Sequence, residues 1–185
     1  QKYGMDPDKI AVWGSSAGGH LVAMLGSTGG VKELDGNLGA HREQSSRVSA
    51  VVNFYGPTAL LQMDDHPSRI KHNAADSPES LLIGKPIQQA RDRTLQASPL
   101  MHVTKDDAPH LTVHGTEDPL VPFHQGMIYH AALKKAGVES TLITVKDGGH
   151  NAPGAVSNGQ MVAFLERHLH GKGEKLADET VVRQR

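Results

Sequence analysis

Short apolar runs alternate with stretches of helical periodicity along most of this chain. Four runs are typical of β-strands, and they cover residues 10–13, 48–55, 110–114 and 140–145. The second is apolar at nearly every position, as expected of a parallel strand covered on both faces. Helical patterns follow the strands at residues 20–25, 123–136 and 158–169. This order predicts an α/β fold of three layers, in which helices cover both faces of a mostly parallel sheet.

Between the second and third strands the chain is irregular. The pattern predicts a short helix there, with Ser77 as N-cap and Pro78 at the first helical position, and then a helix over residues 86–96. Residues 171–185 are charged, and we expect them to form a frayed tail.

Composition and charge narrow the classes of partner. The 185 residues suffice for one domain with a core of ordinary size. The formal net charge is −1 and the basic residues are scattered, so no patch indicates nucleic acid or a membrane surface as a partner. No apolar run approaches the ~18 residues of a membrane span. The absence of Cys excludes a cysteine nucleophile and disulfides, but it fits a secreted and a cytoplasmic protein equally, so the localisation is unknown.

The first strand is followed by a pattern that indicates a nucleophile. Gly14-x-Ser16-x-Gly18 lies between that strand and the next helix, which is the context of a nucleophile elbow. In such a strained turn, residues without a bulky Cβ are expected on either side of the nucleophile. Ser16 at the apex would hold its hydroxyl at the carboxyl end of the strand, where α/β sheets place their sites.

A serine hydroxyl needs a base to take its proton and a third group to orient that base. Asp118 follows the third strand and His150 follows the fourth, so both loops are expected at the sheet edge that holds Ser16. The chain order Ser, Asp, His is the order found in α/β-hydrolases. The sequence therefore predicts a catalytic triad of Ser16, Asp118 and His150, with the backbone N–H of Ala17 as an oxyanion donor.

Three segments carry a resemblance to a known family: residues 13–21 (WGSSAGGHL), 114–122 (HGTEDPLVP) and 148–150 (GGH). They resemble the bacterial esterase and lipase branch of the α/β-hydrolases, and within it the group that includes acetylxylan and feruloyl esterases. The likeness extends over residues 3–169. It implies a serine carboxylesterase that needs no cofactor and acts on short acyl esters, such as acetyl or feruloyl esters of plant polysaccharide. The expected partner is thus a small-molecule or carbohydrate ester.

The resemblance also divides the chain. Residues 1–170 would be the C-terminal portion of an α/β-hydrolase catalytic domain, with residues 58–105 as a cap or insertion. Strands that such enzymes carry before the elbow, and a His-Gly-Gly-type oxyanion loop, have no counterpart in this sequence. We therefore expect that a longer polypeptide, or another chain in a swapped or edge-paired homo-oligomer, covers the first strand from Ile10 to Trp13. Without the second oxyanion donor, turnover would be lower by ~100- to 1000-fold.

Several residues offer alternatives to the triad. Glu117 is adjacent to Asp118 and is the second candidate for the acid, whereas Asp147 lies too near His150 in sequence. We interpret His20 as a packed histidine and His114 as a partner of local backbone groups.

The sequence indicates neither a metal site nor a nucleotide site. The chain contains 12 His, but no tight ligand spacing appears, and His168 and His170 lie at the end of a surface helix. Gly18 and Gly19 are not followed by the Lys and Ser or Thr of a phosphate-binding loop.

Two other functions share the same residues. A peptidase of the prolyl-oligopeptidase type has the same elbow and the same triad order. A truncated hydrolase that keeps the triad residues but has no activity is the non-enzymatic alternative.

Overall fold

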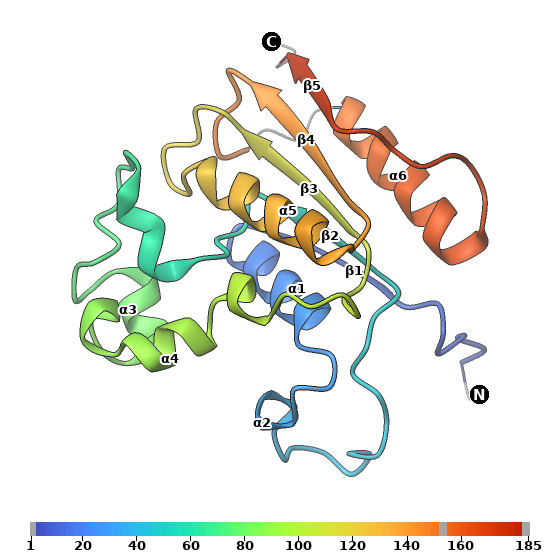
Figure 1. Ribbon diagram of the computed structural model, residues 1–185, viewed down its shortest axis with the longest axis horizontal. Helices are drawn as coiled ribbons and strands as arrows, with labels where there is room; N and C mark the ends of the chain where they lie inside the picture. The colour runs from blue at the N-terminus through green and yellow to red at the C-terminus, as the bar shows by residue number, and fades with distance from the viewer. Residues whose placement is uncertain (1–2, 152–154, 183–185) are drawn as a thin grey trace.

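Five parallel strands form one sheet in the computed structural model, which describes residues 3–151 and 155–182 (Figure 1). Their spatial order, β1-β2-β3-β4-β5, follows the chain order. The strands are β1 (Ala11–Ser15), β2 (Ala50–Phe54), β3 (His110–Gly115), β4 (Ser140–Lys146) and β5 (Glu179–Val182). The first four correspond to the four predicted runs, which confirms the predicted parallel α/β fold.

Helices cover the sheet on two faces. On one face, α1 (Ala17–Ser27) packs against β1 and β2, and α5 (His124–Ala136) packs against β3 and β4. On the other, α6 (Ala155–His170) places Phe164 in the core formed by β2, β3 and β4. Among the described residues, no helix combines the length and the apolar character needed to cross a bilayer.

The segment between β2 and β3 is built from short helices. They are η1 (Leu60–Asp65), α3 (Pro78–Ile83), η2 (Ile87–Gln89), α4 (Arg91–Gln96) and η3 (Pro99–His102). As predicted, Ser77 caps α3, and its side chain accepts a hydrogen bond from the Ser80 N–H. The single helix predicted over residues 86–96 is wrong, because Ala90 adopts φ −123° and ψ 46° between η2 and α4. There the Thr94 hydroxyl donates to the Ile87 carbonyl at 3.1 Å, a local bond that competes with a continuous helix. The assignment of the segment as a cap stays a prediction.

The expectation of a frayed tail after residue 171 is also wrong. β5 pairs with β4 in parallel, and Asp178 just before it accepts a hydrogen bond from the Leu142 N–H at 3.0 Å and from Lys134 Nζ at 3.0 Å. Val181 packs against the core. The strand is only four residues long and mostly exposed, as edge strands often are, and it follows a charged segment, so the sequence pattern did not reveal it.

At the opposite edge, β1 pairs with β2 alone among the described residues. Ile10 and Trp13 are 45% and 65% exposed, so the full burial that their apolar character suggests is absent here. What covers this edge stays a prediction.

Candidate active site

Ser16 lies in the sharp turn between β1 and α1. Its φ of 55° and ψ of −120° are unusual for a residue with a side chain, which is the strain expected of a nucleophile elbow. Backbone hydrogen bonds hold the turn on both sides. The Ser16 N–H donates to the Phe54 carbonyl at 2.9 Å, and the His20 N–H donates to the Ser16 carbonyl at 3.0 Å.

The two glycines of the elbow differ in what they require. A Cβ on Gly14 would lie 2.3 Å from the carbonyl oxygen of Gly18, whereas a Cβ on Gly18 would meet no atom within 4 Å. The expectation that both flanking glycines are needed for space is therefore wrong for Gly18. The residue that must lack a Cβ for α1 to pack closely on the sheet is instead Gly19, where a Cβ would lie 2.5 Å from Asn53 Oδ1.

This difference gives a matched pair of variants. We expect Gly14→Ala to lower the free energy of unfolding by about 1–3 kcal/mol or more, because neither backbone segment can move away easily. Gly18→Ala should leave stability unchanged or raise it by up to about 1 kcal/mol, since Ala favours the helix that Gly18 occupies. Urea unfolding followed by circular dichroism measures both. Equal losses in the two variants would contradict the steric argument.

The loops after β3 and β4 bring Asp118 and His150 to Ser16. His150 Nε2 lies 2.8 Å from Ser16 Oγ, and His150 Nδ1 lies 2.8 Å from Asp118 Oδ2 and 3.1 Å from Oδ1. Because Nδ1 faces a carboxylate, it carries the proton, and the lone pair of Nε2 faces the serine hydroxyl. The Tyr55 ring packs at 4.7 Å from the imidazole, measured between ring centroids. This is the geometry in which a histidine can take the proton of Ser16.

Asp118 is fixed by more than the histidine. Its Oδ1 accepts hydrogen bonds from the N–H groups of Leu120, at 2.8 Å, and Val121, at 3.0 Å. Burial alone would raise the pKa of this carboxyl, but hydrogen bonds from His114, the two N–H groups and His150 outweigh burial and lower it to about 2. Asp118 is therefore a carboxylate at every pH at which the enzyme would work.

The alternative acids lie elsewhere. Glu117 is exposed, and its backbone N–H donates to the Gly148 carbonyl at 2.9 Å. Asp147 is also exposed, in a turn with φ of 59°. The carboxylate that contacts His150 is that of Asp118.

The other histidines have the local partners expected of packed residues. His20 Nε2 donates to the Ala97 carbonyl at 2.7 Å, and burial lowers the pKa of His20. Fully buried His114 donates from Nε2 to the Val121 carbonyl at 2.9 Å, and the same atom lies 3.4 Å from Asp118 Oδ2. His168 lies 3.5 Å from Glu139. Within the ranges that the structure describes, no three His, Asp or Glu side chains gather as metal ligands would.

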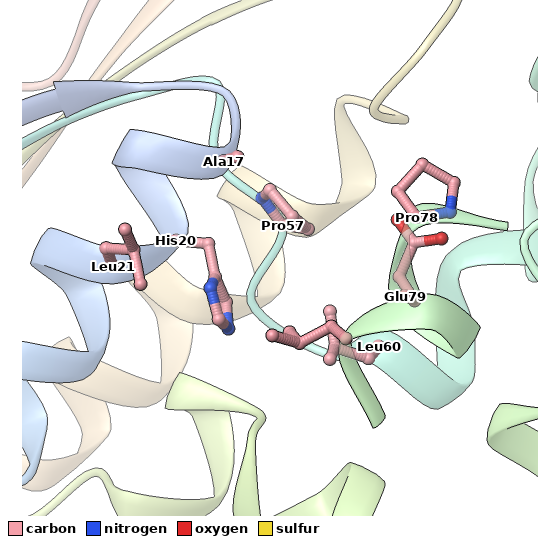
Figure 2. Close-up of a pocket in the computed structure, with 8 residues that line it drawn as sticks. Ala17, His20, Leu21, Pro57, Leu60, Pro78 and Glu79 are labelled. Atoms are coloured by element: carbon pink, nitrogen blue, oxygen red, sulfur yellow. The ribbon is translucent and has the colours of Figure 1, made fainter. Parts of the chain in front are cut away.

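A pocket of about 270 Å³ opens beside the elbow. Figure 2 shows Ala17 and His20 of α1 on one side and Pro78 and Glu79 of α3 on the other. Ala17 is the first residue of α1, so the pocket begins next to Ser16. Its lining is largely apolar: Ala17, His20, Leu21, Pro57, Leu60, Pro78, Glu79 and Leu82.

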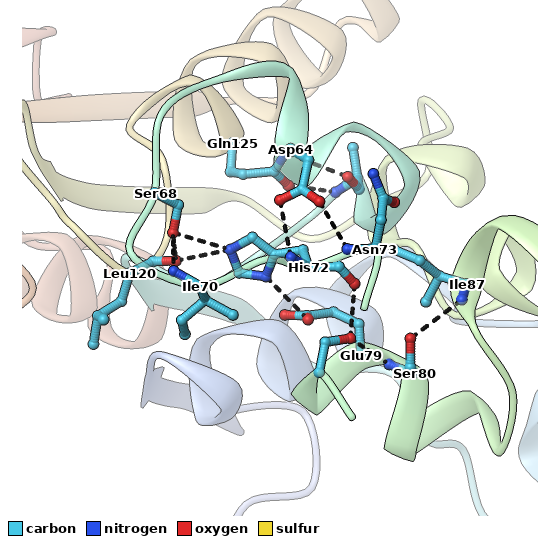
Figure 3. Close-up of polar contacts among 12 residues, drawn as sticks. Asp64, Ser68, Ile70, His72, Asn73, Glu79, Ser80, Ile87, Leu120 and Gln125 are labelled. Carbon is cyan, nitrogen blue, oxygen red and sulfur yellow. Dashed lines mark hydrogen bonds and ion pairs between the residues drawn. The ribbon is translucent and has the colours of Figure 1, made fainter. Parts of the chain in front are cut away.

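No motif indicated the residues that hold the loop of Asp118. Arg69 donates its backbone N–H to the Pro119 carbonyl at 2.7 Å. His72 Nε2 lies 3.1 Å from the Leu120 carbonyl (Figure 3). Ser68 Oγ lies 3.1 Å from the same carbonyl. These residues lie about 50 positions before Asp118 and belong to no recognised motif, so only the folded chain brings them together.

The family can now be identified. The fold is that of the α/β-hydrolases, and the model of the BD-FAE family matches residues 1–133. This chain belongs to the BD-FAE family.

Three similar proteins extend this result. A protein of Mycobacterium tuberculosis named "probable carboxylic ester hydrolase LipM" is 33% identical over 126 residues, which is 67% of this chain and 27% of LipM. A truncated carbohydrate esterase from gut microbiota has 34% identity and a TM-score of 0.81 over 90% of this chain and 62% of its own. A bifunctional GH43-CE protein of Bacteroides eggerthii has 33% identity and a TM-score of 0.83 over 90% of this chain and 24% of its own. This chain spans 27–34% of the length of the first three curated relatives that it matches.

Proposed function

We propose that this chain carries the catalytic residues of a serine carboxylesterase. The observation that carries the proposal is the continuous set of contacts from Ser16 Oγ through His150, at 2.8 Å, to Asp118, at 2.8 Å. Membership of a family whose relatives include ester hydrolases supports it.

The reaction follows from these contacts. Ser16 Oγ attacks the ester carbonyl while His150 Nε2 takes its proton, and Asp118 stabilises the imidazolium that forms. The backbone N–H of Ala17 donates to the oxyanion. The protonated His150 then gives its proton to the leaving alkoxide, and an acyl group stays on Ser16. Water activated by His150 releases the acid. Each step uses only groups of the protein, the substrate and water.

We propose short acyl esters of carbohydrate as the substrates. The pocket beside Ala17 is small, at about 270 Å³, which suits a short acyl group or part of a sugar. Of the two solved structures reported above, one is named a truncated carbohydrate esterase and the other a bifunctional GH43-CE protein, and both resemble this chain over 90% of its length.

Trapping of the acyl-enzyme tests the proposal. The chain is mixed with 4-nitrophenyl acetate, quenched in acid, digested and analysed by mass spectrometry. We expect one acetyl group on Ser16 and none on the adjacent, exposed Ser15, for which Ser15→Ala serves as the control. A folded chain that never acquires an acyl group on Ser16 would contradict an acyl-enzyme mechanism and favour the inactive alternative. Cleavage of an amide such as glycyl-prolyl-4-nitroanilide, faster than of the ester, would favour the peptidase instead.

The pH dependence of hydrolysis gives a second expected result. Only a neutral imidazole can take the serine proton, so kcat/KM should fall as the pH is lowered from 8 to 5. Asp118 adds nothing to this decrease. Its pKa is lowered from 3.8 to about 2, so its contribution to stability is complete above its unfolded pKa and is lost only as the pH falls towards 2. Initial rates on 4-nitrophenyl acetate from pH 5 to 8, with circular dichroism at each pH, measure the effect. A flat profile would count against His150 as the base.

A further inference from the structure

One carboxylate lies in the wall of the pocket beside the elbow. Glu79 of α3 lines this pocket, and its side chain is only 9% exposed. A carboxylate in such a dry site is costly unless it has partners. Apart from Glu79 itself and His20, which is held by the Ala97 carbonyl, the lining side chains of this pocket are apolar. Glu79 is therefore the group there that is best suited to recognise a polar atom of a ligand.

His72 holds Glu79 from behind (Figure 3). Its Nδ1 lies 3.0 Å from Glu79 Oε2, and its Nε2 lies 3.1 Å from the Leu120 carbonyl and 3.2 Å from Ser68 Oγ. Nε2 faces two oxygen acceptors, and Nδ1 lies at ion-pair distance from a carboxylate, an arrangement that suits the doubly protonated ring. Burial alone would lower the pKa of His72, but the carboxylate of Glu79, with help from Asp64 and the Leu120 carbonyl, raises it. In its protonated form His72 is an imidazolium that balances the charge of Glu79.

The surrounding loop leaves this pair little freedom. Asp64 accepts hydrogen bonds from the backbone N–H groups of His72, at 2.9 Å, and Asn73, at 2.7 Å. Ser77 Oγ donates to the His72 carbonyl at 2.7 Å and accepts from the Ser80 N–H at 3.0 Å. The start of α3 is therefore tied to the loop of His72, and Glu79 is positioned before any ligand enters. Such preorganisation lowers the entropic cost of recognition.

We propose that Glu79 is a specificity-determining residue that accepts a hydrogen bond from a hydroxyl group of the substrate bound beside Ala17. This inference rests on the proposed esterase function. A neutral hydroxyl fits better than a cation, because His72 already balances the charge of Glu79. The pocket has room for a small hydroxylated group, such as part of a sugar or of a hydroxy acid. An ester that presents a methyl group at the same place would leave the carboxylate desolvated and without a partner.

Two pairs of esters of nearly equal size test the proposal and identify the side of the ester that enters the pocket. On the alcohol side, 2-hydroxyethyl acetate is compared with propyl acetate. On the acyl side, 4-nitrophenyl glycolate is compared with 4-nitrophenyl propionate. In each pair a hydroxyl group replaces a methyl group. The chain is tested as wild type, Glu79→Met, Glu79→Gln and Glu166→Gln, the last as a control because Glu166 lies on α6 and is partly exposed.

One of the two pairs varies the group that enters the pocket. For that pair, we expect Glu79→Met to lower kcat/KM of the hydroxylated ester by about 10- to 100-fold, and that of its methyl counterpart by less than about twofold. Glu79→Gln keeps an acceptor for His72 and should lower the ratio of kcat/KM for the hydroxylated ester to kcat/KM for its methyl counterpart several-fold. This variant provides a second test if the Met variant does not fold. Glu166→Gln should leave every ratio unchanged. If the Glu79 variants change both members of each pair equally, or change neither, Glu79 serves only to hold His72 and the proposal is wrong.

A binding measurement separates this inference from the esterase function. If the wild type hydrolyses none of the esters, the proposed function fails, and the inference is then decided by binding alone. Saturation-transfer NMR with Ser16→Ala and with Ser16→Ala/Glu79→Met compares the same pairs without turnover. A preference for the hydroxylated ester that disappears with Glu79 supports the proposal. Equal binding of both members by Ser16→Ala overturns it.

Discussion

Ser16→Ala is expected to lower kcat on 4-nitrophenyl acetate by about 10⁴-fold or more, to a rate close to the background. Removal of the Oγ that lies 2.8 Å from His150 Nε2 leaves no atom that can form the acyl-enzyme. The variant should fold normally, because among the described residues the Ser16 hydroxyl hydrogen-bonds only to His150, while backbone groups of Ser16 hold the turn. Initial rates and urea unfolding measure the two effects separately.

His20→Ala is the matched comparison for this result. His20 lies four residues after Ser16 and also lines the pocket. Its Nε2 donates a hydrogen bond to the Ala97 carbonyl, so this nitrogen is not available to the substrate. Loss of that bond leaves a carbonyl without its partner and should cost about 1–3 kcal/mol of stability. Hydrolysis should remain measurable. A loss of activity as large as that of Ser16→Ala, in a folded variant, would show that His20 takes part in the reaction.

The parts of this fold that depend on local sequence could be predicted. β2 is buried at all five positions, and its nearly continuous apolar run indicated this directly. The ends of α3 and α5 follow from Ser77 and from Gly137, which adopts φ of 87° after the last turn of α5. The three triad candidates share an edge because parallel strands all end there, so their approach needed no knowledge of distances.

The parts that depend on distant contacts could not be predicted. β5 is held to β4 partly because Asp178 accepts hydrogen bonds from Leu142 and Lys134, and its four residues, although they include Thr and Val, form too short and too exposed a run to indicate a strand by pattern alone. The contact of His72 with the Leu120 carbonyl joins residues 48 positions apart. Pairing of Glu79 with His72 is likewise invisible in the chain, where both residues are typical of a solvated surface.

The steric requirements for glycine near the elbow could be predicted only in part from the motif. The elbow pattern treats Gly14 and Gly18 alike, yet only Gly14 faces a backbone atom at a distance that excludes a Cβ. Gly19 and Gly56, which approach each other and Asn53, meet the same restriction without belonging to the pattern. A motif records which residue types accompany a turn, while the packing of α1 on β2 decides which of them are required.

Asp118→Asn should lower kcat by about 10⁴-fold with little change in fold. An Asn at this position can still accept hydrogen bonds from the N–H groups of Leu120 and Val121 through its amide oxygen. Its amide nitrogen would face His150 Nδ1 in place of the carboxylate oxygen that now lies at 2.8 Å. That contact favours the tautomer with the proton on Nε2, which cannot take the proton of Ser16.

Glu117→Gln provides the control, because it makes the same chemical change one residue earlier. Glu117 is exposed and contributes its backbone N–H, which the variant keeps, to the Gly148 carbonyl. We expect kcat of Glu117→Gln to stay within about twofold of the wild type, since exposed side chains outside a site contribute little. Steady-state rates on 4-nitrophenyl acetate, with unfolding curves for both variants, decide between the two carboxylates. If Glu117→Gln were the more harmful change, the loop would have to rearrange during catalysis so that Glu117 replaces Asp118 beside His150.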